Sequence, residues 1–297
     1  MPPGPDAGPS RLLEPLAAAA GSAVRELVPV GGGHGARHYR ASLADGRDVF
    51  VKQASAADPD GVARLEAEAR GLRWLAEAGA VPVPEVIFCQ NGAVALPWLS
   101  QDNPSGSAAE RFGRDLAALH LAGADRFGAP WPGFIASLPL PSDRADAWPS
   151  WYATARLLPY CRLARDAGTL SAADIALMDL VVGRIAELAG PSGAEAPSRI
   201  HGDCWSGNVL WSGGRAWLID PAAHGGHRET DLAMLELFGA PFAGRILGAY
   251  REAAPLADGW RARVPLHQLH PLLVHVCLFG AGYRDPALAA ARAALSG

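Results

Sequence analysis

Three polar residues have types and spacings suited to chemistry on a phosphate group. Asp203 and Asn208 stand five residues apart in the segment HGDCWSGNVLW, and Asp220 follows twelve residues later, after the apolar run AWLI. Mg²⁺ prefers oxygen ligands of this kind, and a carboxylate can accept the proton of a hydroxyl group. Phosphoryl transfer needs both functions. We therefore predict that Asn208 and Asp220 ligate Mg²⁺ and that Asp203 is the catalytic base.

Lys52 is the single lysine among the 26 lysine and arginine residues of the chain. It ends the alternating segment DVFVK, which predicts a strand, and Glu68 follows sixteen residues later in a segment with helical spacing. A compact ammonium binds phosphate differently from a planar guanidinium. We predict that Lys52 contacts the phosphates of a nucleotide and that Glu68 holds it in position. Glu66 is interpreted as a solvated helix residue.

The glycine-rich segment VGGGHGARHY precedes the strand that ends at Lys52. Backbone N–H groups of Gly32, Gly33 and Gly35 are predicted to contact the nucleotide, although glycines also simply make turns. For the adenine we predict contacts with Leu96 or Leu99, because Pro97 between them has no N–H group to donate.

Trp205 and His275 are candidate substrate contacts, the tryptophan because it lies inside the catalytic segment. A role for Trp205 in the core is an equal alternative. His267, His270 and His275 have no carboxylate or cysteine at ligand spacing, so we interpret them as helix-face or core residues rather than zinc ligands. His201 is interpreted as a hydrogen-bonding support of the catalytic segment.

These residues are positioned by an α+β N-terminal lobe and a larger helical C-terminal lobe. The pattern predicts a helix over 12–20, strands on both sides of a turn at 44–46, a helix over 61–79, and two strands joined by the turn QNG. Further helices are predicted over 108–123, 150–168, 171–190, 228–239 and 265–282. We divide the chain into a disordered tail (1–10), an N-lobe (11–99) and a C-lobe (100–297), with the boundary at the polar segment SQDNPSGS.

The sequence resembles the fructosamine kinase (ketosamine 3-kinase) family. HGDCWSGNVLW and IDPAAHGGHRETDLAMLELFG carry the resemblance, together with DVFVK, DLAALH and LHPLLVH in the same order, over about residues 20–285. It implies a bilobal, protein-kinase-like fold related to aminoglycoside phosphotransferases. It also implies ATP-dependent phosphorylation of the sugar 3-hydroxyl of ketosamines (fructosamine, ribulosamine or erythrulosamine adducts), after which the adduct decomposes and the amine is restored.

The chain departs from the family pattern at three positions. Cys204 replaces a leucine beside Asp203, Pro97 stands where an acidic residue is common, and Pro271 is expected to kink the helix that contains it. Glu229 and Asp231 are interpreted as structural supports, with Arg228 as the partner of one of them. The four cysteines, Cys204 among them, show no C-x-x-C spacing and are predicted to be free thiols.

Composition narrows the range of partners. The net charge is −4 without a basic stripe, which argues against nucleic acid. No apolar run of about 18 residues predicts a membrane helix, and the first residues lack the features of a signal peptide. We expect a cytoplasmic monomer or homodimer that acts on glycated small amines or glycated protein lysines. An aminoglycoside- or choline-type phosphotransferase and a non-catalytic nucleotide-binding scaffold are the alternatives.

Overall fold

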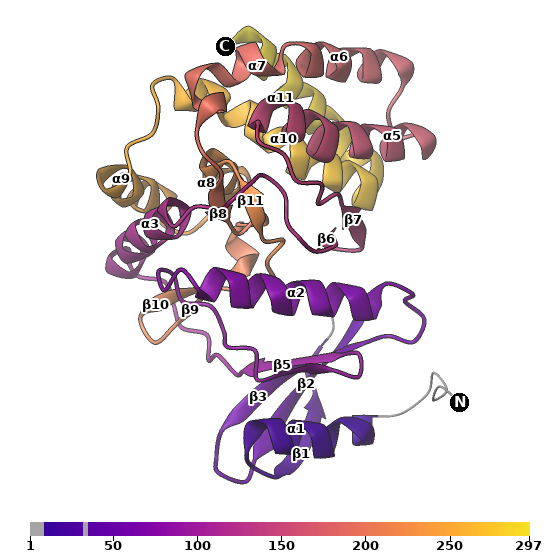
Figure 1. The fold of residues 1–297 in the computed structure, drawn as a ribbon, viewed down its shortest axis with the longest axis vertical. Coiled ribbons are helices and arrows are strands. Elements are labelled where there is room, and N and C mark those ends of the chain that lie inside the picture. The colour runs from indigo at the N-terminus through magenta and orange to yellow at the C-terminus, as the bar shows by residue number, and fades with distance from the viewer. Residues whose placement is uncertain (1–8, 32–34) are drawn as a thin grey trace.

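The computed structural model describes residues 9–31 and 35–297. A small part built on an antiparallel sheet is followed along the chain by a larger, mostly helical part (Figure 1). This arrangement confirms the predicted α+β, protein-kinase-like fold. Gly32, Gly33 and most of the predicted tail lie outside the described residues.

The N-terminal sheet is antiparallel throughout and has the strand order β1-β2-β3-β5-β4. Its strands are β1 (Val24–Pro29), β2 (Ala36–Leu43), β3 (Asp48–Ala54), β4 (Phe88–Gln90) and β5 (Ala93–Pro97). Both predicted turns are confirmed. At the second of them, Asn91 and Gly92 have φ angles of 55° and 68°, the left-handed conformation that a two-residue hairpin turn requires.

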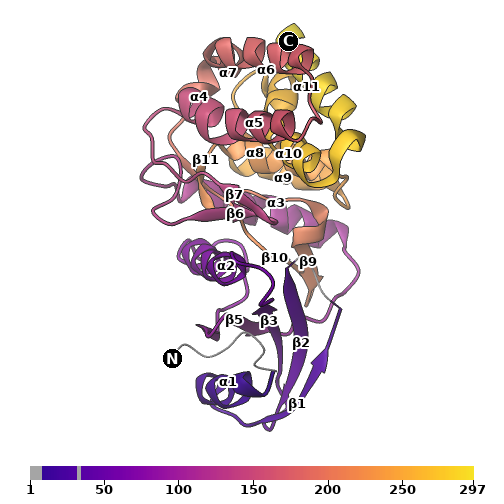
Figure 2. The same ribbon diagram turned by 90° about the vertical axis from the view of Figure 1, so that its right-hand side faces the viewer.

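Two helices cover the opposite faces of this sheet. Helix α1 (Leu13–Ala20) shares a core cluster with Ala93 and Ala95 of β5, whereas α2 (Gly61–Ala76) packs its Leu65 and Leu72 with the intervening Val94. Alternate residues of a strand point to opposite faces, so the two clusters lie on either side of the sheet. Figure 2 shows the sheet between α1 and α2.

A polar segment connects the sheet to the helical part. Strand β5 ends at Pro97, and α3 (Gly106–Leu121) begins after Ser105, whose hydroxyl accepts the N–H of Ala108 at 3.2 Å. Asp102 within the segment donates its N–H to the Trp211 carbonyl at 2.7 Å. We propose that the boundary between the lobes, placed at 99/100, lies in this connection.

The C-terminal part consists of helices around three short strand pairs (Figure 2). Its helices after α3 are α4 (Trp148–Trp151), α5 (Leu158–Asp166), α6 (Ala172–Gly183), α7 (Ile185–Ala189), α8 (Arg228–Leu237), α9 (Ala243–Ala253), α10 (Trp260–Phe279) and α11 (Arg284–Ser296). The strand pairs are β6 (Gly133–Ile135) with β7 (Leu138–Leu140), β8 (Ser198–Ile200) with β11 (His224–Gly226), and β9 (Val209–Ser212) with β10 (Arg215–Leu218).

Two predicted helices are interrupted. The helix expected over 150–168 is split by a π-helical segment, η2 (Tyr152–Leu157), between α4 and α5. The helix expected over 171–190 begins with the predicted capping box of Ser171 and Asp174, but it breaks at Arg184 into α6 and α7. The β6–β7 hairpin is an element that the sequence did not predict.

Pro271 lies inside α10 and does not end that helix. A proline cannot donate to the carbonyl four residues earlier, which here is that of His267. The buried Tyr152 hydroxyl supplies a donor instead, at 3.3 Å from the His267 oxygen and 2.9 Å from the Leu266 oxygen. A side chain of η2 thus supplies the hydrogen-bond donor that α10 lacks at Pro271.

The stretch Trp260–Ser296, which contains α10 and α11, is long and apolar enough to cross a membrane by length and composition alone. Residues of both helices belong to the largest core cluster, where they pack with α5 and α6. Buried polar side chains such as His267 and His270 lie within α10. We therefore interpret this stretch as a pair of core helices.

Candidate active site

A cavity of about 430 Å³ lies between the sheet and the helical part. Strands β2 and β3 and helix α2 form one wall, and the β6–β7 hairpin and the segments around Asp203 and Asp220 form the other. It collects the five residues that the sequence assigns to phosphates, metal and base: Lys52, Glu68, Asp203, Asn208 and Asp220.

Lys52 sits at the centre of an ion-pair network across the cavity. Its ammonium is 2.9 Å from Glu68 Oε1 on α2 and also contacts Asp220 Oδ1. Burial alone would lower the pKa of Lys52, but the two carboxylates raise it overall. Burial raises the pKa of Glu68, whereas Lys52 holds the pKa of Asp220 below its usual range despite burial. Lys52 is therefore a fixed cation that joins the two walls.

Asn208 links the segments that carry Asp203 and Asp220. Its Nδ2 donates to the Asp203 carboxylate at 2.8 Å and to the Asp203 carbonyl at 2.9 Å, and it lies 3.5 Å from the Asp220 carbonyl. Burial raises the pKa of Asp203 to about 7, although the bond from Asn208 acts in the opposite direction. The Asp203 carboxylate is thus a held acceptor whose pKa lies near neutrality.

Asp220 has a backbone conformation that non-glycine residues rarely adopt, with φ of 52°. It directly follows Ile219, whose carbonyl accepts a hydrogen bond from His201 Nε2 at 2.9 Å. Such conformations cost free energy and persist where the surroundings impose them, often at functional sites. The left-handed turn at Asp220 is therefore consistent with a functional role for its carboxylate.

The segment that carries Asp203 is anchored by a buried carboxylate. Both oxygens of Asp231 on α8 accept backbone N–H groups, from His201 at 2.7 Å and Gly202 at 2.9 Å. His120 Nε2, on α3, lies 3.2 Å from the same carboxylate. His201 Nδ1 accepts the Asp203 N–H at 3.3 Å, so its Nε2 carries the proton. The supporting roles predicted for His201 and Asp231 fit these contacts.

Of the three glycines predicted to contact the nucleotide, Gly35 is the one that the structure describes, and it lines the cavity. Its φ is 80°, and a Cβ atom there would collide with the side chains of Asp58 and Arg64. These two side chains form an ion pair with each other. Arg64 also lines the cavity and is a cation that the sequence reasoning missed; its place one turn before Glu68 on the same helix face was the available signal.

Leu96 and Leu99 lie apart from this cavity. The Leu96 side chain packs in the core with Leu65 and Leu72, and neither leucine is among the residues that line the cavity. A contact with adenine from this strand would therefore involve backbone groups, and it stays a prediction.

A second cavity, of about 340 Å³, adjoins the first. Both predicted substrate contacts, Trp205 and His275, line it, and Asp203 is shared by the two cavities. Trp205 is 38% exposed, so it is not a core residue. The hairpin residues Ile135 and Ala136, which were not predicted from the sequence, also line both cavities.

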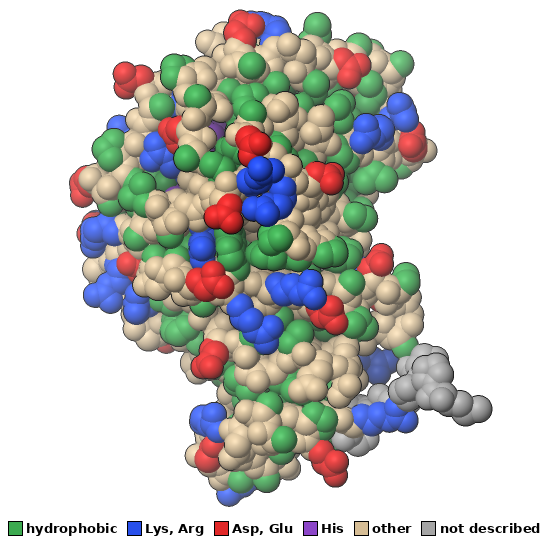
Figure 3. Space-filling view, in the orientation of Figure 1, with side chains coloured by type: hydrophobic (Ala, Val, Ile, Leu, Met, Phe, Trp, Pro, Cys, Tyr) green, Lys and Arg blue, Asp and Glu red, His purple; other side chains and the backbone are tan. Residues whose placement is uncertain are grey.

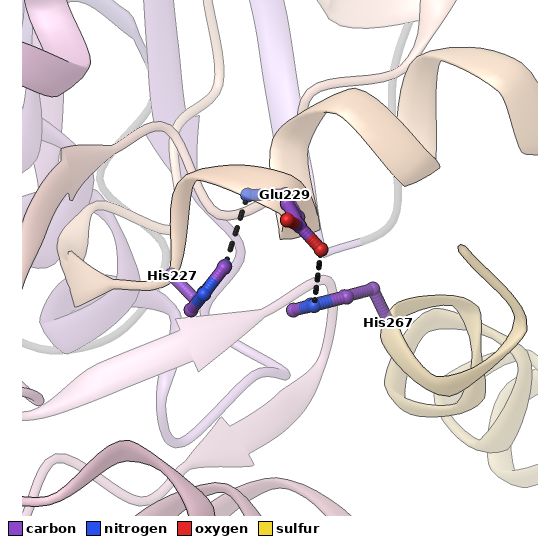
Figure 4. Close-up of side chains that lie close together, drawn as sticks. All are labelled: His227, Glu229 and His267. Carbon is purple, nitrogen blue, oxygen red and sulfur yellow. Dashed lines mark hydrogen bonds and ion pairs between the residues drawn. The ribbon is translucent and has the colours of Figure 1, made fainter. Parts of the chain in front are cut away.

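His227, Glu229 and His267 form a buried cluster within metal-ligand distance of one another (Figure 4). Most of their polar atoms have protein partners; His267 Nε2 has no hydrogen-bond partner among the described residues and lies 3.4 Å from Glu229 Oε2. Both Glu229 oxygens accept from the Arg263 guanidinium, at 2.6 and 2.9 Å. His227 accepts the Glu229 N–H and donates to the Ser192 carbonyl. We therefore interpret the cluster as a structural network, in line with the predicted core role of His267.

The pairing predicted for Arg228 is wrong, and Cys204 is a free thiol as predicted. Arg228 does not pair with Glu229 or Asp231; its guanidinium binds Glu195 at 2.7 and 2.9 Å, because Glu229 is engaged by Arg263. Cys204 is fully buried in the core, and burial raises the pKa of its thiol.

Comparisons with known proteins identify the family. The sequence profile described as fructosamine kinase matches residues 12–296. The chain belongs to the fructosamine kinase family. A probable ketoamine kinase from Thermus thermophilus is 34% identical over 256 residues, which cover 86% of this chain and 89% of the relative.

Solved structures agree with this assignment. A candidate fructosamine-3-kinase from Thermobifida fusca is 49% identical, has a TM-score of 0.92, and is matched over 98% of this chain and 100% of its own. A macrolide 2'-phosphotransferase from Brachybacterium faecium, 20% identical with a TM-score of 0.63 over 95% of this chain and 97% of its own, shares the fold. As a member of the fructosamine kinase family, the chain is an ATP-dependent phosphotransferase.

Proposed function

We propose that this chain phosphorylates the sugar 3-hydroxyl of ketosamines, the adducts of fructose, ribulose or erythrulose with amines. The observation that carries the proposal is the joint placement of Lys52, Asp203, Asn208 and Asp220 around one cavity. The family supports the substrate class. The phosphorylated adducts are unstable, so the reaction leads to deglycation of small amines or protein lysines in the cytoplasm. The enzyme acts as a monomer or a homodimer.

In this proposal the nucleotide is held from both walls. Lys52 binds the ATP phosphates and Glu68 keeps the ammonium in place, as their 2.9 Å contact allows. Backbone groups of the glycine-rich segment, Gly35 among them, cover the phosphates. The contact between Lys52 and Asp220 rearranges when the nucleotide binds, because both side chains then have other partners.

The oxygen atoms present suit Mg²⁺, which prefers hard oxygen ligands. Asn208 directs its Nδ2 to Asp203, which leaves its Oδ1 available to a cation. Asp220 offers a carboxylate whose pKa is held low by Lys52 despite burial. The bound ion would neutralise charge on the phosphates. Asn208 and Asp220 are therefore its proposed ligands.

Asp203 is the proposed general base. Its carboxylate orients the 3-hydroxyl of the sugar and accepts its proton as the oxygen attacks the terminal phosphate of ATP. The bond from that phosphorus to the bridging oxygen breaks, and ADP leaves. A pKa of about 7 suits this task, since proton transfer is most efficient when the pKa lies near the working pH. Trp205 and His275, which line the adjoining cavity, are the proposed contacts of the substrate.

A substrate panel tests the proposal. The protein is incubated with ATP, Mg²⁺ and fructosyl-, ribulosyl- or erythrulosyl-amines, with an aminoglycoside and choline as controls, and the products are identified by phosphorus NMR. We expect a new 3-phosphate signal with ketosamines only. Phosphorylation of the aminoglycoside or choline alone would assign the site to another class of small-molecule kinase, and no ATP turnover with any acceptor would support a non-catalytic scaffold.

A further inference from the structure

The second cavity is joined to the proposed catalytic site at one end. Asp203, Trp205, Ile135 and Ala136 line both the 430 Å³ and the 340 Å³ cavities. A molecule that presents a hydroxyl to Asp203 therefore has room to extend into the second cavity.

Five of the twelve residues that line this second cavity have aromatic rings. His275, Phe279 and Tyr283 follow one another at intervals of four residues along the end of α10 and the turn after it, which places them on one side of the chain. The centroid of the His275 ring is 4.7 Å from that of Tyr283 and 4.8 Å from that of Phe238, which follows α8. The lining also contains the apolar side chains of Met234, Pro271, Val274 and Leu278.

The described lining carries one full charge, the Asp203 carboxylate, and neither arginine nor lysine. His275 does not add a positive charge. Burial lowers its pKa, and its ring lies 2.7 Å from the Pro271 carbonyl through Nδ1, which fixes that nitrogen as a donor. The described lining of the second cavity therefore offers apolar surface and one carboxylate, but no cationic side chain to pair with an anion.

The chemistry of a ketosamine brings its amine close to the Asp203 carboxylate. The amine is bonded to C1 of the sugar, and the reacting hydroxyl is on C3, only two carbon atoms away. When the hydroxyl lies at Asp203, the group on the amine (its carrier) starts within a few bonds of the same carboxylate. A carboxylate on the carbon next to the amine would add a negative charge close to Asp203. The protonated amine is common to all ketosamines and does not distinguish the carriers, whereas the two carboxylates repel each other in a partly buried site.

We propose that the cavity formed by Trp205, Phe238, His275, Phe279 and Tyr283 is a carrier subsite. It selects ketosamines whose carrier is an uncharged alkyl or aryl group, including the chain of a lysine side chain, over those whose carrier bears an α-carboxylate. The inference rests on the proposed function and specifies its substrate class. Apolar carriers gain from burial against the aromatic walls by about fourfold in affinity per methylene group. Carriers with an α-carboxylate lose affinity by repulsion.

A matched pair of substrates tests the selection. N-fructosyl-isobutylamine and N-fructosyl-valine differ by the carboxylate alone, and N-fructosyl-valinamide restores the size of the latter without its charge. We expect kcat/KM to be about tenfold or more higher for isobutylamine than for valine, with valinamide close to isobutylamine. Equal values for all three substrates would overturn the carrier subsite while leaving the proposed function intact. Phosphorylation of none of them would overturn the proposed function itself.

A charge introduced into the wall gives the second arm. Phe279 is 54% exposed at the end of α10, so Phe279→Arg can be accommodated, and it should reduce or reverse the preference against valine. Phe242→Arg is the control, because Phe242 is also exposed but lines neither cavity. A preference that stays the same in Phe279→Arg, or that shifts equally in the control, would contradict the proposed location of the carrier.

Discussion

Asp203 combines two properties that a base needs, a fixed orientation and a pKa near neutrality. Replacing it by asparagine keeps an oxygen that can accept the Asn208 Nδ2 bond, so the loop should retain its geometry. We expect Asp203→Asn to lower kcat by about 10²–10⁴-fold while ATP affinity changes little, because Asp203 is not a proposed metal ligand. Steady-state kinetics and nucleotide titration measure the two effects separately, with the exposed Asp125→Asn as control. Full activity would rule out Asp203 as the base.

Lys52 is almost fully buried between Glu68 and Asp220, which leaves little space for a larger head group. A guanidinium is planar and binds in a fork, so we expect Lys52→Arg to displace the phosphates and lower kcat at saturating ATP on the order of 10²-fold. Glu68→Gln should show a weaker defect, since it frees the ammonium without removing it.

The reverse exchange, Arg70→Lys, serves as the control for this pair of variants. Arg70 lies on the exposed face of α2, the helix that carries Glu68. If Lys52→Arg retained a near-normal kcat, the single lysine of the chain would reflect drift rather than a geometric requirement.

The sequence predicted which candidate site residues come together when they lie close in the chain, such as Asp203 and Asn208. It also did so when they lie on consecutive elements, such as Lys52 and Glu68. It did so because each pair lies on one loop or on adjacent elements. The partners of Arg228 and the contribution of Ile135 could not be predicted in this way. Both depend on how distant elements pack, and Arg228 had several acidic neighbours in sequence but meets Glu195 in space.

Among the elements, the helices and strands of the N-terminal sheet followed their sequence patterns closely, whereas the segment over 150–168 did not. Its composition favours a continuous helix, but the structure contains the π-helical η2. A π-helical turn has no distinctive composition of its own and is retained where tertiary contacts favour it. Here η2 places Tyr152 against α10, a contact that local sequence cannot specify.

The contact between Tyr152 and α10 can be tested by mutation. The Tyr152 hydroxyl donates towards the carbonyls of Leu266 and His267 and accepts the His270 N–H at 3.3 Å. We expect Tyr152→Phe to lower the free energy of unfolding by about 1–3 kcal/mol, because it leaves buried backbone groups without a partner. Urea unfolding measures this loss. Tyr283→Phe, which removes a partly exposed hydroxyl, should cost much less; equal losses would show that the bridge to α10 is unimportant.

At the scale of the whole molecule, buried neutral histidines make the fold sensitive to acid. Burial lowers the pKa of both His224 and His227 to about 3, whereas in an unfolded chain each binds a proton near pH 6.5. Unfolding then takes up protons, so stability falls as the pH decreases from about 6.5 towards 3. Each histidine contributes up to about 1.4 kcal/mol per pH unit in that window.

We expect urea unfolding at pH 7.5, 6.0 and 5.0 to show a progressive loss, of at least about 2 kcal/mol by pH 5. His227→Gln should have a shallower pH dependence than the unaltered chain, whatever its stability at pH 7.5. A free energy of unfolding that stays constant over this range would mean that these histidines are protonated in the folded protein.

The single, ion-paired lysine has a consequence for the chemical ageing of the protein itself. Reducing sugars attack lysine side chains in their unprotonated form. Lys52 is 6% exposed, and the carboxylates of Glu68 and Asp220 keep it protonated by raising its pKa despite burial. A chain with no other lysine side chain thus withholds from sugars the very group whose glycation the proposed reaction reverses. After prolonged incubation with ribose, mass spectrometry should find Lys52 unmodified in the folded protein and modified after unfolding in urea. Rapid modification of the folded protein at Lys52 would show that the ion pairs do not shield this lysine. If Lys52 stays unmodified, the enzyme resists the damage that it is proposed to repair.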